Sequence, residues 1–205
     1  DKYDKIKKLY EDVKNITGID VAKLTFESSE EELSQTKNTQ IAILTMSLGI
    51  LKILEENGIK ADIAAGLSLG EYTALMYANS FSFEDGVKIV KKRGELMQEY
   101  VPEGNWLMAA ILGLDDNKVE EVCKSVKSGF VTPANYNCVG QIVVSGDENG
   151  ITELSEKAKE AGARKVAILK TGGPFHTEKL SEASKLLREE LEKIEIKTPE
   201  VEVIK

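Results

Sequence analysis

The sequence predicts an α/β fold in which a body built on a parallel sheet carries an inserted subdomain. A Gly-x-Ser-x-Gly pentapeptide, residues 66–70, lies where a short apolar strand ends and a helix begins. Residues 106–170 alternate between strand-like and helix-like stretches in the order β-α-β-β-α-β, which is the ferredoxin-like order. We therefore expect residues 1–105 and 171–205 to form the body, and residues 106–170 to form a ferredoxin-like subdomain.

The first half of the body is predicted to be mostly helical. Apolar residues spaced by three and four predict a first helix that ends at Gly18 and a second that ends near Gly58. Between them, residues 28–34 are acidic and polar, which indicates a loop or a short helix. Residues 63–65 predict the strand that leads into the pentapeptide, and a helix follows it to about Ala78.

A long helix is predicted to begin at the segment Ser82-Phe83-Glu84-Asp85, which resembles a capping box. It extends to about Tyr100, and Pro102 and Gly104 end it. After the subdomain, residues 180–194 predict a charged amphipathic helix, and residues 201–203 begin a further strand.

Within the subdomain, the predicted elements are strand 107–114, helix 116–127, strand 130–136, strand 141–145, helix 149–161 and strand 165–169. Asn135, Asn137 and Gln141 flank the predicted hairpin turn. Their amides suit turn geometry, and they equally suit the lining of a cleft beside the body. Both interpretations stay open.

Composition is that of an ordinary globular protein. The 205 residues are 41% hydrophobic and 30% charged, and the net charge of −8 argues against general binding to nucleic acid or anionic membranes. No apolar run is long enough to span a bilayer. Because the chain begins with Asp1 and stops at Lys205 after an apparent strand, we expect it to be a fragment.

The cysteines and the histidine limit the metal chemistry that the chain offers. Cys123 and Cys138 lack the spacing of metal ligands, and there is one histidine, so we expect no zinc site. We expect both thiols to be packed and reduced, as in a cytoplasmic protein.

Ser68 is the candidate nucleophile. On a strand-turn-helix bend, a serine is held in a strained backbone conformation with its hydroxyl exposed. Gly66 and Gly70 leave room for the bend and for a substrate. The following helix points free N–H groups toward an oxyanion that forms near the serine. The pattern indicates acyl chemistry, although a serine after a glycine is also common in turns and helix caps.

Arg93 falls on the apolar stripe of the long helix, three residues after Val90 and four before Met97. A buried arginine needs a partner, because an unpaired charge in a dry site is costly. Its side chain could form a structural ion pair or extend outward to solvent. Alternatively, its guanidinium binds the carboxylate of a substrate. Gly94 allows a backbone or ligand to approach closely, and Met97 is either core or the floor of a pocket.

His176 is the only histidine, and it follows a rigid turn, Gly173-Pro174-Phe175. A lone histidine is often a surface or core residue. However, a serine nucleophile needs a base with a pKa near neutrality, and no other side chain here offers one unperturbed. If Ser68 is catalytic, we therefore expect His176 to be its base.

Several segments in a fixed order carry a family resemblance. They are residues 66–72 (GLSLGEY), 93–98 (RGELMQ), 101–104 (VPEG), 108–114 (MAAILGL) and 173–176 (GPFH). Together they make nearly the whole chain resemble malonyl-CoA:acyl-carrier-protein transacylases. The resemblance implies an α/β-hydrolase-like body that moves a malonyl group from malonyl-CoA to the phosphopantetheine thiol of acyl carrier protein.

The resemblance also implies the role of each site residue. Ser68 matches the nucleophile that forms a malonyl-serine intermediate, and His176 matches the base. Arg93 matches the arginine that binds the malonyl carboxylate, and the N–H of Leu69 matches half of the oxyanion hole. Phe175 resembles the malonyl-selective version of its segment. The family needs no metal or redox cofactor and is usually monomeric.

The sequence departs from the family pattern in two places. Leu67 stands where many members have histidine, a position that is not the base. The N-terminal Gly-Gln-Gly strand and the C-terminal part with a second glutamine have no counterpart, so we expect both flanks of the body to be absent. Acyl carrier proteins are acidic, so the candidate docking patches are basic: Lys91 with Lys92, and Arg164 with Lys165 and Lys170.

Two other functions remain open. Serine esterases and thioesterases share the strand-turn-helix bend at the serine. In their fold, an acidic residue lies between the serine and the histidine in chain order. A truncated, non-catalytic scaffold that binds carrier protein or CoA is the other alternative, and the missing flanks are its main support.

Overall fold

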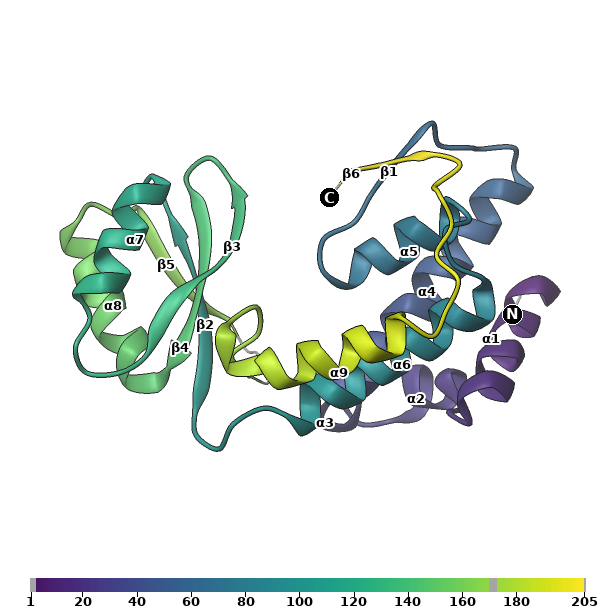
Figure 1. Cartoon of the computed structure of the whole chain (residues 1–205), viewed down its shortest axis with the longest axis horizontal. Helices are drawn as coiled ribbons and strands as arrows, with labels where there is room; N and C mark the ends of the chain where they lie inside the picture. Colours follow the sequence, from purple (N-terminus) through teal and green to yellow (C-terminus); the bar gives the residue numbers. More distant parts are fainter. Residues whose placement is uncertain (1–2, 170–172, 205) are drawn as a thin grey trace. The chain divides into compact units, whose positions relative to one another are not determined.

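The computed structural model describes residues 3–169 and 173–204 and has an α/β fold with one parallel and one antiparallel sheet (Figure 1). The chain divides into two compact units, Asp1–Leu96 with Lys185–Lys205, and Met97–Ser184. The second unit is wider than the segment 106–170 predicted as a subdomain. Local contacts explain the extension, since the indole N–H of Trp106 donates to the Pro102 carbonyl at 2.8 Å and Phe175 packs on the sheet.

The helices that begin in the first unit are α1 (Asp4–Thr17), α2 (Val21–Glu27), α3 (Glu30–Leu33), α4 (Thr36–Glu56), α5 (Leu69–Tyr77) and α6 (Phe83–Glu99). The predicted ends of the first two long helices are confirmed, because Gly18 and Gly58 both have φ of 74° there. The short helix α2 was not predicted. It begins where the Asp20 carboxylate accepts the Lys23 N–H at 3.0 Å, and it is too short to show a periodic pattern.

The core of the first unit lies among α1, α2, α4 and α6. Each of these helices contributes apolar side chains that are fully or almost fully buried, among them Leu9, Val13, Val21, Ile41, Leu44, Val87 and Val90. Burial of such side chains is the main stabilising contribution to the unit, at about 1.5–3 kcal/mol for each. This packing holds α4 and α6, which carry two of the residues of the candidate site.

The parallel sheet of the first unit pairs β1 (Ile63–Ala65) with β6 (Glu202–Ile204). The chain before β6 is tied to the end of α5, since Lys197 N–H donates to the Ser80 carbonyl at 3.0 Å and Glu200 N–H to the Ala78 carbonyl at 2.8 Å. Both strands match predicted ones. The parallel sheet of the predicted fold class is thereby confirmed.

The second unit contains β2 (Trp106–Leu112), α7 (Asp116–Ser125), β3 (Val131–Cys138), β4 (Gln141–Asp147), α8 (Glu148–Glu160) and β5 (Lys165–Leu169). The strands form an antiparallel sheet in the order β3-β4-β2-β5. Asp115 and Asp147 begin the two helices, because their carboxylates accept the N–H groups of Lys118 and Gly150, each at 2.8 Å. The predicted sequence of strands and helices is the one observed.

The two faces of this sheet differ. Figure 1 shows α7 and α8 on the same face, where Ile111, Ile142 and Leu154 are buried among their neighbours. The opposite face carries a small apolar cluster of Met108, Ala110 and Val143, and Phe175 packs against it. After Phe175, the chain forms the 3₁₀ helix η1 (Glu178–Leu180) and then α9 (Ser181–Leu191). A single helix over residues 180–194 was predicted there.

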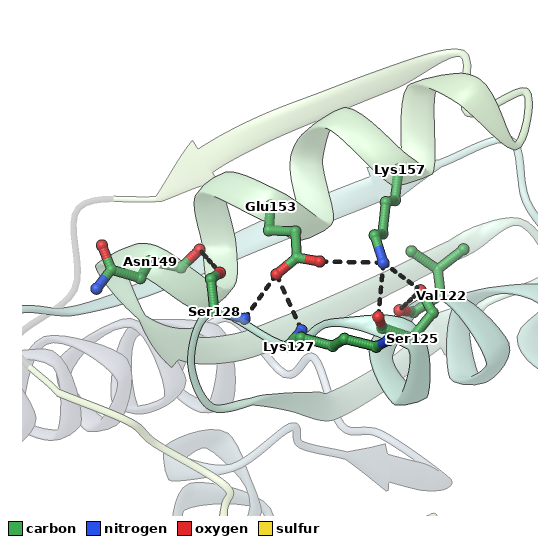
Figure 2. Close-up of polar contacts among 7 residues, drawn as sticks. All are labelled: Val122, Ser125, Lys127, Ser128, Asn149, Glu153 and Lys157. Atoms are coloured by element: carbon green, nitrogen blue, oxygen red, sulfur yellow. Dashed lines mark hydrogen bonds and ion pairs between the residues drawn. The ribbon is translucent and has the colours of Figure 1, made fainter.

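A polar network ties α8 to the loop between α7 and β3 (Figure 2). The Glu153 carboxylate accepts the backbone N–H of Lys127 at 2.9 Å and of Ser128 at 2.7 Å, and it pairs with Lys157 at 3.0 Å. Lys157 also donates to the Ser125 carbonyl at 2.6 Å, so its charge sits at the C-terminal end of α7. Hydrogen bonding by Ser128 first, and by Lys127 and Lys157 after it, holds the pKa of Glu153 far below its ordinary value of 4.5, at about 2.

No helix in the described parts of the chain combines the length and the apolar content that crossing a bilayer requires.

Candidate active site

Ser68 lies between β1 and α5, at the N-cap position of α5. Its backbone has φ of 54° and ψ of −106°, a combination that residues other than glycine rarely adopt. Holding it costs on the order of 1–3 kcal/mol, which the surrounding fold must supply. Within residues 3–169 and 173–204, the non-glycine residues with positive φ are Ser68, Asn79 and His176, and asparagine tolerates that conformation best.

The bend at Ser68 depends on Gly66 and not on Gly70. A Cβ at Gly66 would lie 2.1 Å from the carbonyl carbon of Gly70 and 2.4 Å from the Glu71 nitrogen, which no side chain can accommodate. A Cβ at Gly70 would meet no atom within 4 Å. The glycine before the serine therefore permits the bend, and the glycine after it leaves open space beside the helix start.

Arg93 is buried on α6, with 8% of its surface exposed, as its place on the apolar stripe predicted. Its Nη2 donates a hydrogen bond to the Ser68 hydroxyl at 2.8 Å, and its Nη1 donates to the side-chain carbonyl oxygen of Gln40. Burial lowers the pKa of Arg93, while Tyr72 and Glu71 oppose that effect. No carboxylate of the described residues forms an ion pair with it, so the structural ion-pair interpretation lacks a partner there.

Gly94 explains how Gln40 reaches Arg93. A Cβ at Gly94 would lie 2.9 Å from the Cα of Lys37, so the glycine lets the backbone of α4 come against α6. Gln40 follows Lys37 by one helical turn and is 5% exposed. The close approach predicted for Gly94 is thus made by a backbone, and it sets the amide of Gln40 opposite the guanidinium.

Tyr72 forms one side of the Arg93 site. The Arg93 Cζ lies 5.5 Å from the centre of the Tyr72 ring, which is a cation–π distance. Tyr72 comes from the first turn of α5 and stacks on Phe81 with ring centres 6.3 Å apart. Burial raises the pKa of its hydroxyl, so the ring is neutral near pH 7.

Leu69 and Met97 are the other predicted site residues close to this cluster in sequence. Leu69 is the first residue of α5, so its N–H is one of the N-terminal donors without an acceptor inside the helix. Met97 follows Arg93 by one turn of α6 and is half-buried. Their predicted roles, in an oxyanion hole and as a substrate contact, stay predictions.

His176 belongs to the second unit, where it is exposed and has φ of 59°. The turn that presents it is built by two hydrogen bonds, from Phe175 N–H to the Gly173 carbonyl at 2.9 Å and from the Thr177 hydroxyl to the Pro174 carbonyl at 2.7 Å. Phe175 fixes the turn to the sheet face that α7 and α8 leave uncovered. The pairing of His176 with Ser68 stays a prediction.

The predicted amides lie at the free end of the β3–β4 hairpin. The turn itself is Val139-Gly140, with φ of 76° at Gly140, so Asn135 and Asn137 are part of β3 instead of the turn. Asn135 pairs with Val143 and is therefore on the sheet face that carries Phe175. Gln141 begins β4, and its amide oxygen accepts from the Cys138 thiol at 3.7 Å. The backbone conformation of a turn therefore does not explain why asparagines stand at these two positions.

The two cysteines differ in burial. Cys123 is buried on α7, and burial raises the pKa of its thiol to about 12. Cys138 is unpaired but exposed, so the prediction that both thiols are packed is wrong for it. A register shift between Tyr136 and Cys138 interrupts the regular pairing of β3 just before the exposed tip of the hairpin, where Cys138 pairs with Gln141.

The described residues offer no group of three or more His, Cys, Asp or Glu side chains that could hold a metal ion. Of the predicted docking patches, Lys91 pairs with Glu95 at 3.6 Å on α6, and Arg164 and Lys165 are exposed at the start of β5. Lys170 lies outside the described residues.

A family model described as "Acyl transferase domain" matches residues 3–205, nearly the entire chain. The chain belongs to the acyl transferase domain family. The resemblance seen in the sequence segments is thereby confirmed, and the serine at the bend of a strand-turn-helix unit lies inside the matched region.

Relatives within the family carry a more specific name. A "Malonyl CoA-acyl carrier protein transacylase" of Bacillus subtilis (strain 168) is 44% identical over 200 residues, which cover 97% of this chain and 63% of the relative. One of the same name from Staphylococcus aureus (strain MRSA252) is 48% identical over 165 residues, covering 80% of this chain and 53% of that protein. The chain thus spans less than two thirds of the length of these relatives.

Solved structures of similar proteins resemble the chain as well. A malonyl CoA-acyl carrier protein transacylase from Clostridium perfringens has a TM-score of 0.90 and 40% identity, covering 98% of this chain and 64% of that one. A second, described as a type II PKS acyl-carrier protein in complex with its malonyl-transacylase, has a TM-score of 0.92 and 35% identity, covering 98% of this chain and 66% of that one.

Sequence reasoning missed two members of the site, Gln40 and Tyr72. Gln40 sits one turn before Leu44 on the buried stripe of α4, so a polar residue on an apolar stripe was the available signal. Tyr72 gave no such signal, because a tyrosine in the first turn of a helix is ordinary.

Proposed function

We propose that the chain transfers a malonyl group from malonyl-CoA to the phosphopantetheine thiol of an acyl carrier protein. The observation that carries the proposal is the 2.8 Å hydrogen bond between the buried Arg93 guanidinium and the Ser68 hydroxyl, which sets an anion-binding group beside a nucleophile. In a malonyl group, one methylene separates the acyl carbonyl from the carboxylate. An acyl group bonded to Ser68 therefore carries its carboxylate within reach of Arg93.

The first half-reaction forms a malonyl-serine ester. His176 takes the proton from the Ser68 hydroxyl, and the oxygen attacks the thioester carbonyl of malonyl-CoA. The tetrahedral intermediate collapses, the carbon–sulfur bond breaks, and the CoA sulfur leaves with the proton that His176 returns. The N–H of Leu69 and the N-terminal end of α5 stabilise the oxyanion, and one such donor contributes about 3 kcal/mol.

The second half-reaction reverses these steps with a new thiol. His176 takes the proton from the phosphopantetheine thiol, the sulfur attacks the ester carbonyl, and Ser68 leaves with the proton. Both half-reactions exchange one acyl acceptor for another. They therefore need no metal and no redox cofactor.

Specificity for malonyl over acetyl groups follows from the burial of Arg93. A bound malonyl carboxylate gives the guanidinium an anionic partner, whereas an acetyl group leaves the charge without one. The difference is on the order of 2–5 kcal/mol, because a desolvated charge without its partner is unfavourable. The neutral hydrogen-bond acceptors around Arg93 support this assignment, since they leave its charge for the ligand.

The fold supports finer assignments that we also propose. The serine bend between β1 and α5, beside a parallel strand pair, is typical of an α/β-hydrolase-like body. The β-α-β-β-α-β order and the sheet order β3-β4-β2-β5 support a ferredoxin-like second unit. On that unit, Asn135, Asn137 and Gln141 are the candidate substrate contacts from the hairpin.

The partner and setting of the chain are also proposals. The acidic carrier protein would dock on basic residues, for which Lys91 with Lys92 and Arg164 with Lys165 are the described candidates. We expect no nucleic acid or membrane as a partner, because the net charge of −8 opposes both. We expect a monomer in the cytoplasm, and the unpaired Cys123 and Cys138 suit a reducing compartment.

The test is to incubate the chain with malonyl-CoA and holo acyl carrier protein, and to follow free CoA, free malonate and malonyl-carrier protein together. The proposal predicts that malonyl-carrier protein accumulates in step with CoA. Release of malonate without transfer would favour the esterase or thioesterase alternative. Binding of malonyl-CoA with neither product would favour the non-catalytic scaffold.

A further inference from the structure

The guanidinium of Arg93 is held by groups that carry no charge. Its hydrogen bonds go to the side-chain oxygen of Gln40 and to the hydroxyl of Ser68, and its face lies over the Tyr72 ring. All of these residues belong to the first unit. An arginine with 8% exposure is commonly paired with a carboxylate, so the chemistry of these partners is informative.

The amide of Gln40 orients the guanidinium of Arg93 as a carboxylate would, but it carries no charge. Its oxygen accepts a hydrogen bond from Nη1, which restricts the rotation of the guanidinium in its pocket. Because the amide is neutral, it holds the guanidinium without neutralising the charge that an anion would bind. A glutamate has the same length and shape, and it would neutralise that charge.

The position of Gln40 is determined by the backbone. The contact of Gly94 with Lys37 brings α4 against α6 one turn before Gln40, and Gln40 itself is 5% exposed. Such a buried side chain has little freedom to turn away from the guanidinium. Its hydrogen bond to Arg93 is therefore a feature of the packed core and not of a mobile surface.

We propose that Gln40 is a positioning residue that makes this site selective for acyl groups bearing a carboxylate. It orients Arg93 through Nη1 and, by being uncharged, leaves the guanidinium to bind the anion of the substrate. This inference rests on the proposed function, because it concerns which acyl groups reach Ser68.

Two substitutions separate orientation from charge. Gln40→Met keeps the length of the side chain and replaces the amide oxygen by a thioether, which is only a weak hydrogen-bond acceptor. Gln40→Glu keeps the acceptor and adds a negative charge. For each variant and the unchanged chain, rates of acylation of Ser68 by malonyl-CoA and by acetyl-CoA are measured by intact mass, and thermal unfolding is recorded as a control for folding.

For Gln40→Met, we expect the malonyl rate to fall by roughly 3- to 10-fold while the acetyl rate is unchanged, because the acetyl group does not use Arg93. For Gln40→Glu, we expect the ratio of malonyl to acetyl rates to fall by roughly 10- to 100-fold, because two negative charges then compete for one guanidinium. A general loss of folding would lower both rates together and leave their ratio unchanged.

Three results would overturn the inference. They are a malonyl rate in Gln40→Met equal to that of the unchanged chain, a rate ratio in Gln40→Glu equal to that of the unchanged chain, and a parallel loss of both rates in a variant whose thermal unfolding is unchanged. If the unchanged chain forms no acyl adduct, the proposed function fails by itself. The affinities for inert malonyl and acetyl amide analogues of CoA then decide the role of Gln40 by the same ratio.

Discussion

The guanidinium of Arg93 donates a hydrogen bond to the hydroxyl of Ser68 across 2.8 Å. One residue comes from the bend before α5 and the other from the third turn of α6, and both lie in the first unit. The group suited to bind a carboxylate and the group suited to attack an acyl carbon are thus direct neighbours. The proposed transfer of a malonyl group depends on this contact.

Removing the guanidinium should change which acyl group is accepted. In Arg93→Ala, we expect kcat/KM for malonyl-CoA to fall by about 100-fold or more, because the carboxylate loses its partner in a desolvated site. Acetyl-CoA should react no worse than before, so the preference shifts toward it. Arg93→Lys keeps the charge but loses the planar fork, and it should recover only part of the malonyl rate. An unchanged preference for malonyl-CoA in Arg93→Ala would show that Arg93 does not bind the malonyl carboxylate.

The two glycines around Ser68 should respond differently to an added methyl group. We expect Gly66→Ala to abolish acylation and to lower the melting temperature, because its Cβ would overlap the backbone of Gly70 and Glu71. Gly70→Ala is the matched control, since its Cβ would meet no atom within 4 Å. It should fold as stably as the unchanged chain. Equal effects of the two substitutions on melting temperature would contradict this description of the bend.

The ring of Tyr72 should contribute to the binding of the anion through Arg93. A cation–π contact is worth about 0.5–2 kcal/mol, so Tyr72→Leu should lower the malonyl acylation rate by roughly 2- to 30-fold. Tyr72→Phe retains the ring and its stacking on Phe81, and it should stay close to the unchanged chain. If Phe and Leu at this position give the same rate, the aromatic face has no part in holding Arg93.

The carboxylate of Glu153 should make the stability of the second unit depend on pH. Its pKa is about 2 in the folded state against an ordinary value of 4.5. The stabilisation is therefore present above about pH 4.5 and is lost as the pH falls toward 2. In Glu153→Gln, we expect a lower free energy of unfolding at pH 7 and a weaker decline between these pH values, measured by urea denaturation.

Glu84 provides the control for this measurement. It pairs with Lys88, one turn along α6, and its side chain is 63% exposed. Such exposed pairs contribute little, so Glu84→Gln should leave the pH profile unchanged. If Glu153→Gln and Glu84→Gln had the same effect on the free energy of unfolding, the network in Figure 2 would not stabilise the fold.

Elements with a strong periodic pattern could be predicted from the sequence. The strand predicted over residues 165–169 is observed with the same bounds, and Gly18 and Gly58 end the helices that they were expected to end. The helix Val21–Glu27 was missed, because its start depends on one side-chain cap and its length on tertiary packing. Some helices end at a different residue from the predicted one, because packing and not the periodic pattern determines the end. The last helix, for example, ends at Leu191.

The site was predictable in its charged and nucleophilic members and not in its neutral ones. A serine in a Gly-x-Ser-x-Gly bend and an arginine on an apolar stripe each conflict with their surroundings, and this conflict indicates function. Gln40 gives only the weak signal of one polar residue on the apolar stripe of α4, and the ring of Tyr72 conflicts with nothing locally. The role of Gln40 arises from the approach of α4 to α6 at Gly94, and that of Tyr72 from its 5.5 Å distance to Arg93. Spacing along the chain contains neither of these contacts.

Acylation of Ser68 beside Arg93 is tested most directly by the mass of the intact chain after incubation with malonyl-CoA. We expect one malonyl adduct, mapped to Ser68, that is absent in Ser68→Ala and strongly reduced in Arg93→Ala. We also expect holo acyl carrier protein to remove the adduct. An adduct on another residue, or malonyl-CoA binding with no adduct at all, would contradict the proposed transfer.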